Sequence, residues 1–103
     1  MENLDQETWR NQLANDKNAV LLDVRTPEEF EEGFIPGAIL ANIQEPQEFM
    51  NSTQELDKSK NFYVYCKSGG RSTQACQIMD QLGFSSTFNL EGGFSIWEGE
   101  VAK

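Results

Sequence analysis

One short segment carries the residue types and spacing of a nucleophilic site. Cys66 ends an apolar run, and the small-residue loop Lys67-Ser68-Gly69-Gly70 separates it from Arg71 and Ser72. A glycine-containing loop that enters a helix can point several backbone N–H groups at one place, where the helix dipole adds partial positive charge. Together with Lys67 and Arg71, these groups would lower the pKa of a thiol. We therefore predict that Cys66 is a nucleophile that needs no separate base.

The rest of the composition excludes other kinds of chemistry. The chain contains no histidine. This excludes serine–histidine and cysteine–histidine dyads within the chain, histidine metal sites and imidazole acid–base catalysis. The two cysteines, Cys66 and Cys76, are too few for a disulfide scaffold or a four-ligand zinc site. We therefore expect neither a metal nor another cofactor.

The charge balance and the start of the chain bear on partners and location. There are 17 acidic and 8 basic residues, a formal net charge of −9, which disfavours nucleic acids and anionic membranes as partners. The acidic start Met1–Asp5 lacks the features of a secretory signal, and no apolar run is long enough to span a membrane. We expect a cytoplasmic protein, a monomer or weak dimer, with a single domain over residues 1–103.

The elements that must hold the loop alternate between strand and helix. Ala19–Val24 is apolar except for one aspartate, as buried parallel strands are, and Asn61–Tyr65 has the composition of a strand that ends at Cys66. Thr26 and Glu29 have the spacing of a capping box at a helix start. The alternation predicts an α/β domain with a largely parallel sheet and helices on both faces. Further helices are expected after Asp5, from residue 46 and over 72–82, and further strands over 38–43 and 87–90.

Several segments of the chain resemble one protein family. Cys66–Ser72 resembles the active-site loop of rhodanese-family sulfurtransferases. Three other segments resemble the same family in the same order: Leu22–Phe30, Gly33–Ala38 and Leu90–Phe94. Together the motifs cover the chain from about Ala19 to Trp97. The resemblance implies a single-domain rhodanese with a central, largely parallel sheet of five strands.

The resemblance also implies a sulfur relay in two steps. The Cys66 thiolate would take the outer sulfur of a small anionic donor, either thiosulfate or a persulfide. The Cys66 persulfide would then pass this sulfur to a thiol or to cyanide, and a protein thiol is a further candidate acceptor. Arg71 would bind the anion and Lys67 would steer it. The implied substrate-binding residues are Lys67, Ser68, Gly69, Gly70, Arg71 and Ser72.

Three other functions compete with a thiosulfate sulfurtransferase. Phosphatase relatives of the fold use a loop one residue longer, with arginine at the seventh position, where this chain has Ser72; the shorter loop favours sulfur transfer. An interaction or regulatory module without turnover stays open, because Phe34 stands where many family members have histidine. A persulfide carrier for a dedicated partner would share the chemistry and differ in its acceptor.

Other candidate residues have structural interpretations. Asp23 and Arg25 lie at the end of the first predicted strand and predict an ion pair that supports the loop rather than a catalytic role. Cys76 lies in the predicted helix beside apolar residues and predicts core packing rather than a resolving thiol. A solvated helix face is predicted for the acidic cluster Glu28, Glu29, Glu31 and Glu32.

Overall fold

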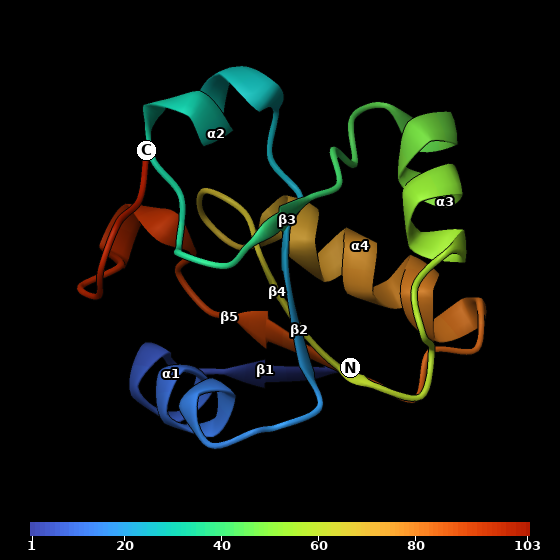
Figure 1. Cartoon of the computed structure of the whole chain (residues 1–103), viewed down its shortest axis with the longest axis horizontal. Helices are drawn as coiled ribbons and strands as arrows, with labels where there is room; N and C mark the ends of the chain where they lie inside the picture. The colour runs from blue at the N-terminus through green and yellow to red at the C-terminus, as the bar shows by residue number, and fades with distance from the viewer.

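The computed structural model describes residues 1–103, which form one sheet with helices packed on both faces (Figure 1). Neighbouring strands are parallel throughout, in the order β1-β5-β4-β2-β3. The predicted α/β fold with a five-stranded parallel sheet is confirmed. The strands are β1 (Glu2–Leu4), β2 (Ala19–Asp23), β3 (Ile39–Leu40), β4 (Asn61–Tyr65) and β5 (Ser86–Leu90). The helices are α1 (Gln6–Ala14), α2 (Pro27–Glu32), α3 (Pro46–Gln54), α4 (Gly70–Gln81) and the short 3₁₀ helix η1 (Phe94–Ile96).

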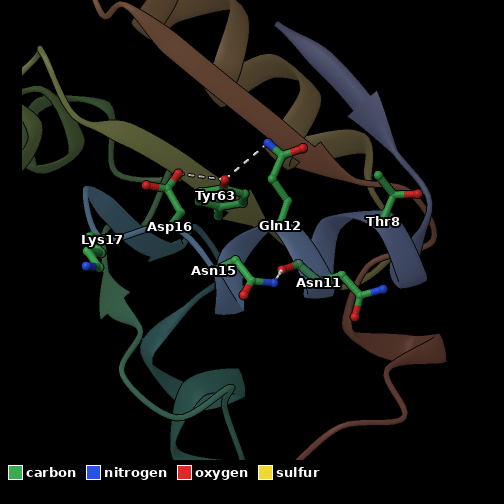
Figure 2. Close-up of a pocket in the computed structure, with 7 residues that line it drawn as sticks. All are labelled: Thr8, Asn11, Gln12, Asn15, Asp16, Lys17 and Tyr63. Carbon is green, nitrogen blue, oxygen red and sulfur yellow. Dashed lines mark hydrogen bonds between the residues drawn. The ribbon is translucent and has the colours of Figure 1, made fainter.

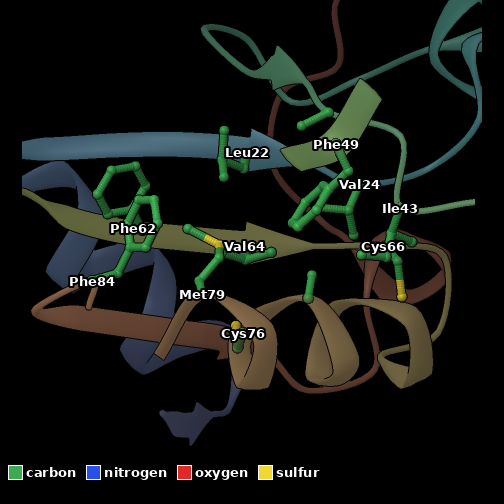
Figure 3. Packing of buried hydrophobic residues seen from close by; sticks show 12 residues of the cluster. Leu22, Val24, Ile43, Phe49, Phe62, Val64, Cys66, Cys76, Met79 and Phe84 are labelled. Carbon is green, nitrogen blue, oxygen red and sulfur yellow. The ribbon is translucent and has the colours of Figure 1, made fainter. Parts of the chain in front are cut away.

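Side chains of β2 and β4 point alternately to the two faces of the sheet, and both faces are buried. The apolar composition of these strands follows from burial on both sides. One face packs against α3 and α4 (Figure 3), and the strands and their ends contribute Leu22, Val24, Phe62, Val64 and Cys66 to it. The other face packs against Trp9 of α1, and the same strands contribute Leu21, Tyr63 and Tyr65.

The first two helices begin at the predicted capping residues. The Thr8 N–H donates to the Asp5 carboxylate at 2.9 Å, which caps α1. Thr26 and Glu29 form the reciprocal capping box of α2, and Pro27 occupies an opening position of that helix. Local chemistry therefore sets where α2 begins, directly after the end of β2.

The differences from prediction lie mainly at the sheet edges. β1 is an additional strand that no sequence pattern indicates, and it joins the sheet by pairing with β5. The strand expected over 38–43 is shortened to Ile39–Leu40, because beyond Leu40 the chain keeps only the backbone bonds of Ala41 and Ile43 to the end of β2. α4 begins two residues earlier than predicted, at Gly70. None of the helices combines the length and apolar character needed to cross a membrane.

The strand order changes direction between β2 and β4. The chain passes from β2 outward to β3 on one side, and from β4 to β5 on the other. Loops that follow parallel strands meet at the carboxyl edge of the sheet, and ligands bind where the order changes direction. The residues that follow β4 at this place are Cys66 and its loop.

Candidate active site

The loop after β4 folds back on the Cys66 sulfur. Cys66 is fully buried, and its sulfur points toward the first turn of α4 (Figure 3). Gly69 precedes the helix with φ of +108°, an angle that glycine adopts without strain. This turn brings the Gly69 N–H within 3.0 Å of the sulfur.

Hydrogen-bond donors surround the sulfur and change its acidity. Besides the Gly69 N–H, the Ser72 hydroxyl lies 3.3 Å from the Cys66 Sγ. Burial raises the pKa of the Cys66 thiol, but hydrogen bonds from Ser72, Gly69 and Ser68 outweigh burial. The pKa therefore lies below that of an ordinary cysteine. The site favours the thiolate, which is the nucleophilic form.

Alkylation should detect this thiolate. Only the thiolate reacts, so we expect iodoacetamide to label Cys66 with a pH midpoint below that of an ordinary cysteine thiol. Ser72→Ala removes one donor and should raise the midpoint. Peptide mass spectrometry after timed labelling across the pH range measures both effects. A wild-type midpoint at or above that of free cysteine would contradict the lowered pKa.

A turn after β5 holds the start of the loop. The Phe94 N–H donates to the Cys66 carbonyl at 2.8 Å, and the Ser95 N–H donates to the Lys67 carbonyl at 2.9 Å. Gly93 has φ of +62°, and a Cβ at this position would lie 2.6 Å from both carbonyl oxygens. Glycine at position 93 therefore permits a backbone contact that fixes Cys66 and Lys67.

Asp23 and Arg25 form a buried ion pair next to this turn. The Arg25 Nη2 lies 2.7 Å from the Asp23 Oδ2, and the Tyr65 hydroxyl donates to the same oxygen at 2.7 Å. Arg25 also donates to the Gly33 carbonyl at 2.7 Å, and its guanidinium carbon lies 4.4 Å from the centre of the Phe94 ring. The pair thus joins the ends of β2 and β4 to the turn after α2 and to η1.

Arg71 binds Glu29 of α2 at two points. Arg71 Nη1 donates to Glu29 Oε1 at 2.7 Å, and Nη2 donates to Oε2 at 2.9 Å. The hydrogen bond from Arg71 lowers the pKa of Glu29 to about 2, against the effect of burial. The predicted solvated face is therefore wrong for Glu29, which is half-buried, whereas Glu28, Glu31 and Glu32 are exposed. The anion that Arg71 holds in this structure is the Glu29 carboxylate.

The other loop residues predicted to bind substrate lie around the sulfur or at the rim. Lys67, Ser68 and Gly70 are exposed, and Ser72 is buried. A cavity of about 250 Å³ lies beside Lys67, between α2 and η1. The structure therefore places Gly69 and Ser72 against the Cys66 sulfur, while the cavity is lined by Lys67 and not by Cys66.

A larger cavity of about 630 Å³ lies elsewhere (Figure 2). It is lined by α1, by Asp16 and Lys17 just before β2, and by Tyr63, so it opens toward the amino edge of the sheet. Its polar groups bind one another: the Tyr63 hydroxyl donates to Asp16 at 2.8 Å and accepts from Gln12 at 3.1 Å. Burial raises the pKa of Tyr63 to about 12. The larger cavity therefore lies away from Cys66, the predicted nucleophile.

Comparison with known proteins decides the family. The sequence model of the rhodanese-like domain matches residues 6–100. The chain belongs to the rhodanese-like domain family. The crystal structure of a rhodanese-like domain protein from Staphylococcus aureus matches this rhodanese-like domain with a TM-score of 0.81 and 30% sequence identity, over 97% of this chain and 94% of that chain.

Relatives of this rhodanese-like domain include proteins named for sulfur transfer. A sulfurtransferase of Allochromatium vinosum is 36% identical over 95 residues, which cover 91% of this chain and 85% of that protein. A thiosulfate sulfurtransferase of Pseudomonas syringae is 33% identical over 86 residues, which cover 84% of this chain and 78% of that protein. At these coverages, each match spans the part of this chain that contains the Cys66 loop.

Two further residues of this rhodanese-like domain have packing roles. Cys76 is fully buried in the core, and burial raises the pKa of its thiol to about 12, so the predicted core packing is confirmed. Phe34 stacks on Phe30 with ring centres 4.0 Å apart, and its backbone pairs with Ala102. Phe34 therefore packs against α2 and the C-terminal segment.

Sequence reasoning misses two contributors to the site. Glu29 matches a capping box completely, so its spacing gives no sign of a second role as the partner of Arg71. Gly93 belongs to a glycine pair that indicates a turn, but the pattern does not reveal that this turn contacts Cys66. Both roles depend on contacts between segments that are distant in the chain.

Proposed function

We propose that this rhodanese-like domain is a sulfurtransferase, which moves a sulfane sulfur from thiosulfate or a persulfide to a thiol or to cyanide through a persulfide on Cys66. The observation that carries the proposal is the Cys66 sulfur, enclosed by a loop whose Gly69 and Ser72 donors point at it. These donors stabilise a thiolate without an imidazole, which suits a chain that has no histidine. The names of the relatives from Allochromatium vinosum and Pseudomonas syringae agree with this function.

The proposed relay has two balanced steps. First, the Cys66 thiolate attacks the outer sulfur of thiosulfate; a new S–S bond forms, the donor's S–S bond breaks, and sulfite leaves with the electron pair. Second, an acceptor thiolate or cyanide attacks the outer sulfur of the Cys66 persulfide, and Cys66 leaves as a thiolate. The persulfide is an anion longer than the thiolate by one S–S bond of about 2.05 Å. The amides from Lys67 to Ser72 are the groups proposed to stabilise it.

Access to the sulfur requires a movement of the loop. Cys66 has no exposed surface, and Glu29 occupies both terminal nitrogens of Arg71. A donor anion therefore binds Arg71 by sharing it with Glu29 or by displacing Glu29. We propose that release of this ion pair admits the donor, because it frees Arg71, in the first turn of α4, to bind an anion beside the Cys66 loop.

Single-turnover assays test the proposed function against phosphate chemistry. With excess thiosulfate and no acceptor, about one sulfite per chain should appear, because each Cys66 accepts one sulfur before it needs an acceptor. p-Nitrophenyl phosphate should stay intact, since Ser72 stands where the phosphatase relatives have arginine. Release of phosphate without release of sulfite would overturn the proposal.

In the structure, the full burial of Cys66 favours a second function, an interaction module without turnover. Such a module would leave Cys66 unlabelled by iodoacetamide in the folded protein and would release no sulfite. A persulfide carrier would differ only in the second step, with faster transfer to a protein thiol than to cyanide. Measuring both acceptors on the preformed persulfide separates the carrier from the enzyme.

A further inference from the structure

A small cavity lies beside Lys67, the residue that directly follows Cys66. Its volume is about 250 Å³, below the range of about 300–1,000 Å³ for sites that hold drug-sized ligands. Its walls come from α2, the Cys66 loop and η1. The lining residues are Arg25, Glu29, Glu32, Gly33, Lys67, Phe94 and Ser95.

The cavity walls are bonded to both ends of the loop. The Phe94 N–H donates to the Cys66 carbonyl and the Ser95 N–H donates to the Lys67 carbonyl, at 2.8 and 2.9 Å. Glu29, another lining residue, holds Arg71 in the first turn of α4. A molecule in this cavity therefore lies against the segment that encloses the reactive sulfur.

Two of the four charges around the cavity lack a partner. Arg25 and Glu29 are neutralised in the ion pairs described above. Glu32 on α2 and Lys67 on the loop are exposed, form no ion pair with any residue, and do not pair with each other. The cavity thus presents one free carboxylate on one wall and one free ammonium on another.

We propose that this cavity is the acceptor subsite, and that it takes a small zwitterionic thiol, such as an amino acid that carries a thiol, an ammonium and a carboxylate. Glu32 binds the ammonium and Lys67 binds the carboxylate. A ligand with both charges satisfies both free groups, whereas a dianionic donor is repelled by Glu32. The inference rests on the proposed sulfur transfer and specifies its second step.

The transfer conserves atoms and electrons. The acceptor thiol loses its proton to solvent, and its thiolate attacks the outer sulfur of the Cys66 persulfide. A new S–S bond forms on the acceptor, the bond from Cys66 Sγ to the outer sulfur breaks, and its electron pair returns to Sγ. The product is an amino-acid persulfide, and no external oxidant or reductant takes part.

Acceptor kinetics on the preformed persulfide test the subsite. Four acceptors differ in the charges that they carry. L-Cysteine carries both charges and cysteamine only the ammonium. 3-Mercaptopropionate carries only the carboxylate, and 2-mercaptoethanol carries neither charge. After correction for thiolate fraction, wild type should prefer L-cysteine. Glu32→Gln should raise KM for L-cysteine and cysteamine by about two- to fivefold, the size expected of one exposed charge pair. It should leave 2-mercaptoethanol unchanged and should not raise KM for 3-mercaptopropionate, whose carboxylate Glu32 repels.

A matched control and a second measurement keep the outcomes separable. Glu31→Gln removes an exposed carboxylate from the same helix outside the cavity and should change no acceptor. S-Methyl-L-cysteine, which cannot accept sulfur, should slow iodoacetamide labelling of Cys66 more in wild type than in Glu32→Gln. Equal effects of Glu32→Gln on all four acceptors, or no effect on any of them, would overturn the subsite. If the protein still releases sulfite from thiosulfate in that case, the proposed function remains supported. Loss of sulfite release would instead remove the proposed function itself.

Discussion

Cys66→Ser should reduce sulfite release from thiosulfate by at least about a thousandfold. A serine hydroxyl fits the same space and keeps the donors from Gly69 and Ser72, so the fold should be retained. However, the hydroxyl stays protonated at neutral pH and cannot form a persulfide. A thiosulfate assay with stopped-time sulfite detection measures the change. A variant with full activity would show that the relay does not pass through Cys66.

The same substitution at the other cysteine is the matched control. Cys76 lies in the core, and Thr87 offers a partner for a hydroxyl there. Cys76→Ser should therefore lower the free energy of unfolding by about 1 kcal/mol and leave sulfite release per folded chain unchanged. A loss of activity equal to that of Cys66→Ser would mean that the two thiols act together.

Gly93→Ala should damage both stability and activity. Its φ of +62° is unfavourable for alanine, which costs about 1–3 kcal/mol of unfolding free energy. The new Cβ would also lie 2.6 Å from the carbonyl oxygens of Cys66 and Lys67, so the start of the loop must shift. We expect the pKa of Cys66 to rise toward its ordinary value and kcat/KM for thiosulfate to fall at least about tenfold. Denaturant unfolding, alkylation and sulfite assays measure these effects.

Gly83→Ala separates strain from contact. Gly83 has φ of +93°, but a Cβ there meets nothing within 4 Å. This variant should lose about 1–3 kcal/mol of unfolding free energy and keep the wild-type alkylation midpoint and sulfite release. If Gly93→Ala matches Gly83→Ala in all three measurements, the turn after β5 does not position Cys66.

The central part of the fold is predictable because its signals are local. β2 and β4 are buried on both faces, which forces the apolar composition that marks them as strands. The edge strands are less predictable: β1 has three residues and no strand pattern, and β3 keeps only two residues of the strand expected over 38–43. Backbone pairing with a neighbouring strand defines both. Such pairing depends on the rest of the sheet and leaves little trace in side-chain types.

The same division applies to the site. The Cys66 loop and the helix that follows it are adjacent in the sequence, so their geometry can be derived from glycine conformations and helix termini. The link from Arg71 to Glu29 joins the loop to a helix more distant in the sequence, and the capping box already explains the glutamate. The sequence therefore predicts the loop that folds around Cys66 but not the carboxylate that holds Arg71.

The most direct test of the central claim is the mass of the protein after exposure to thiosulfate. We expect a gain of about 32 Da, the mass of one sulfur atom, on the peptide that contains Cys66, together with one equivalent of sulfite. The added mass should disappear when a thiol acceptor or cyanide is added. An unchanged mass, or a sulfur atom on Cys76 instead, would contradict a relay through a persulfide on Cys66.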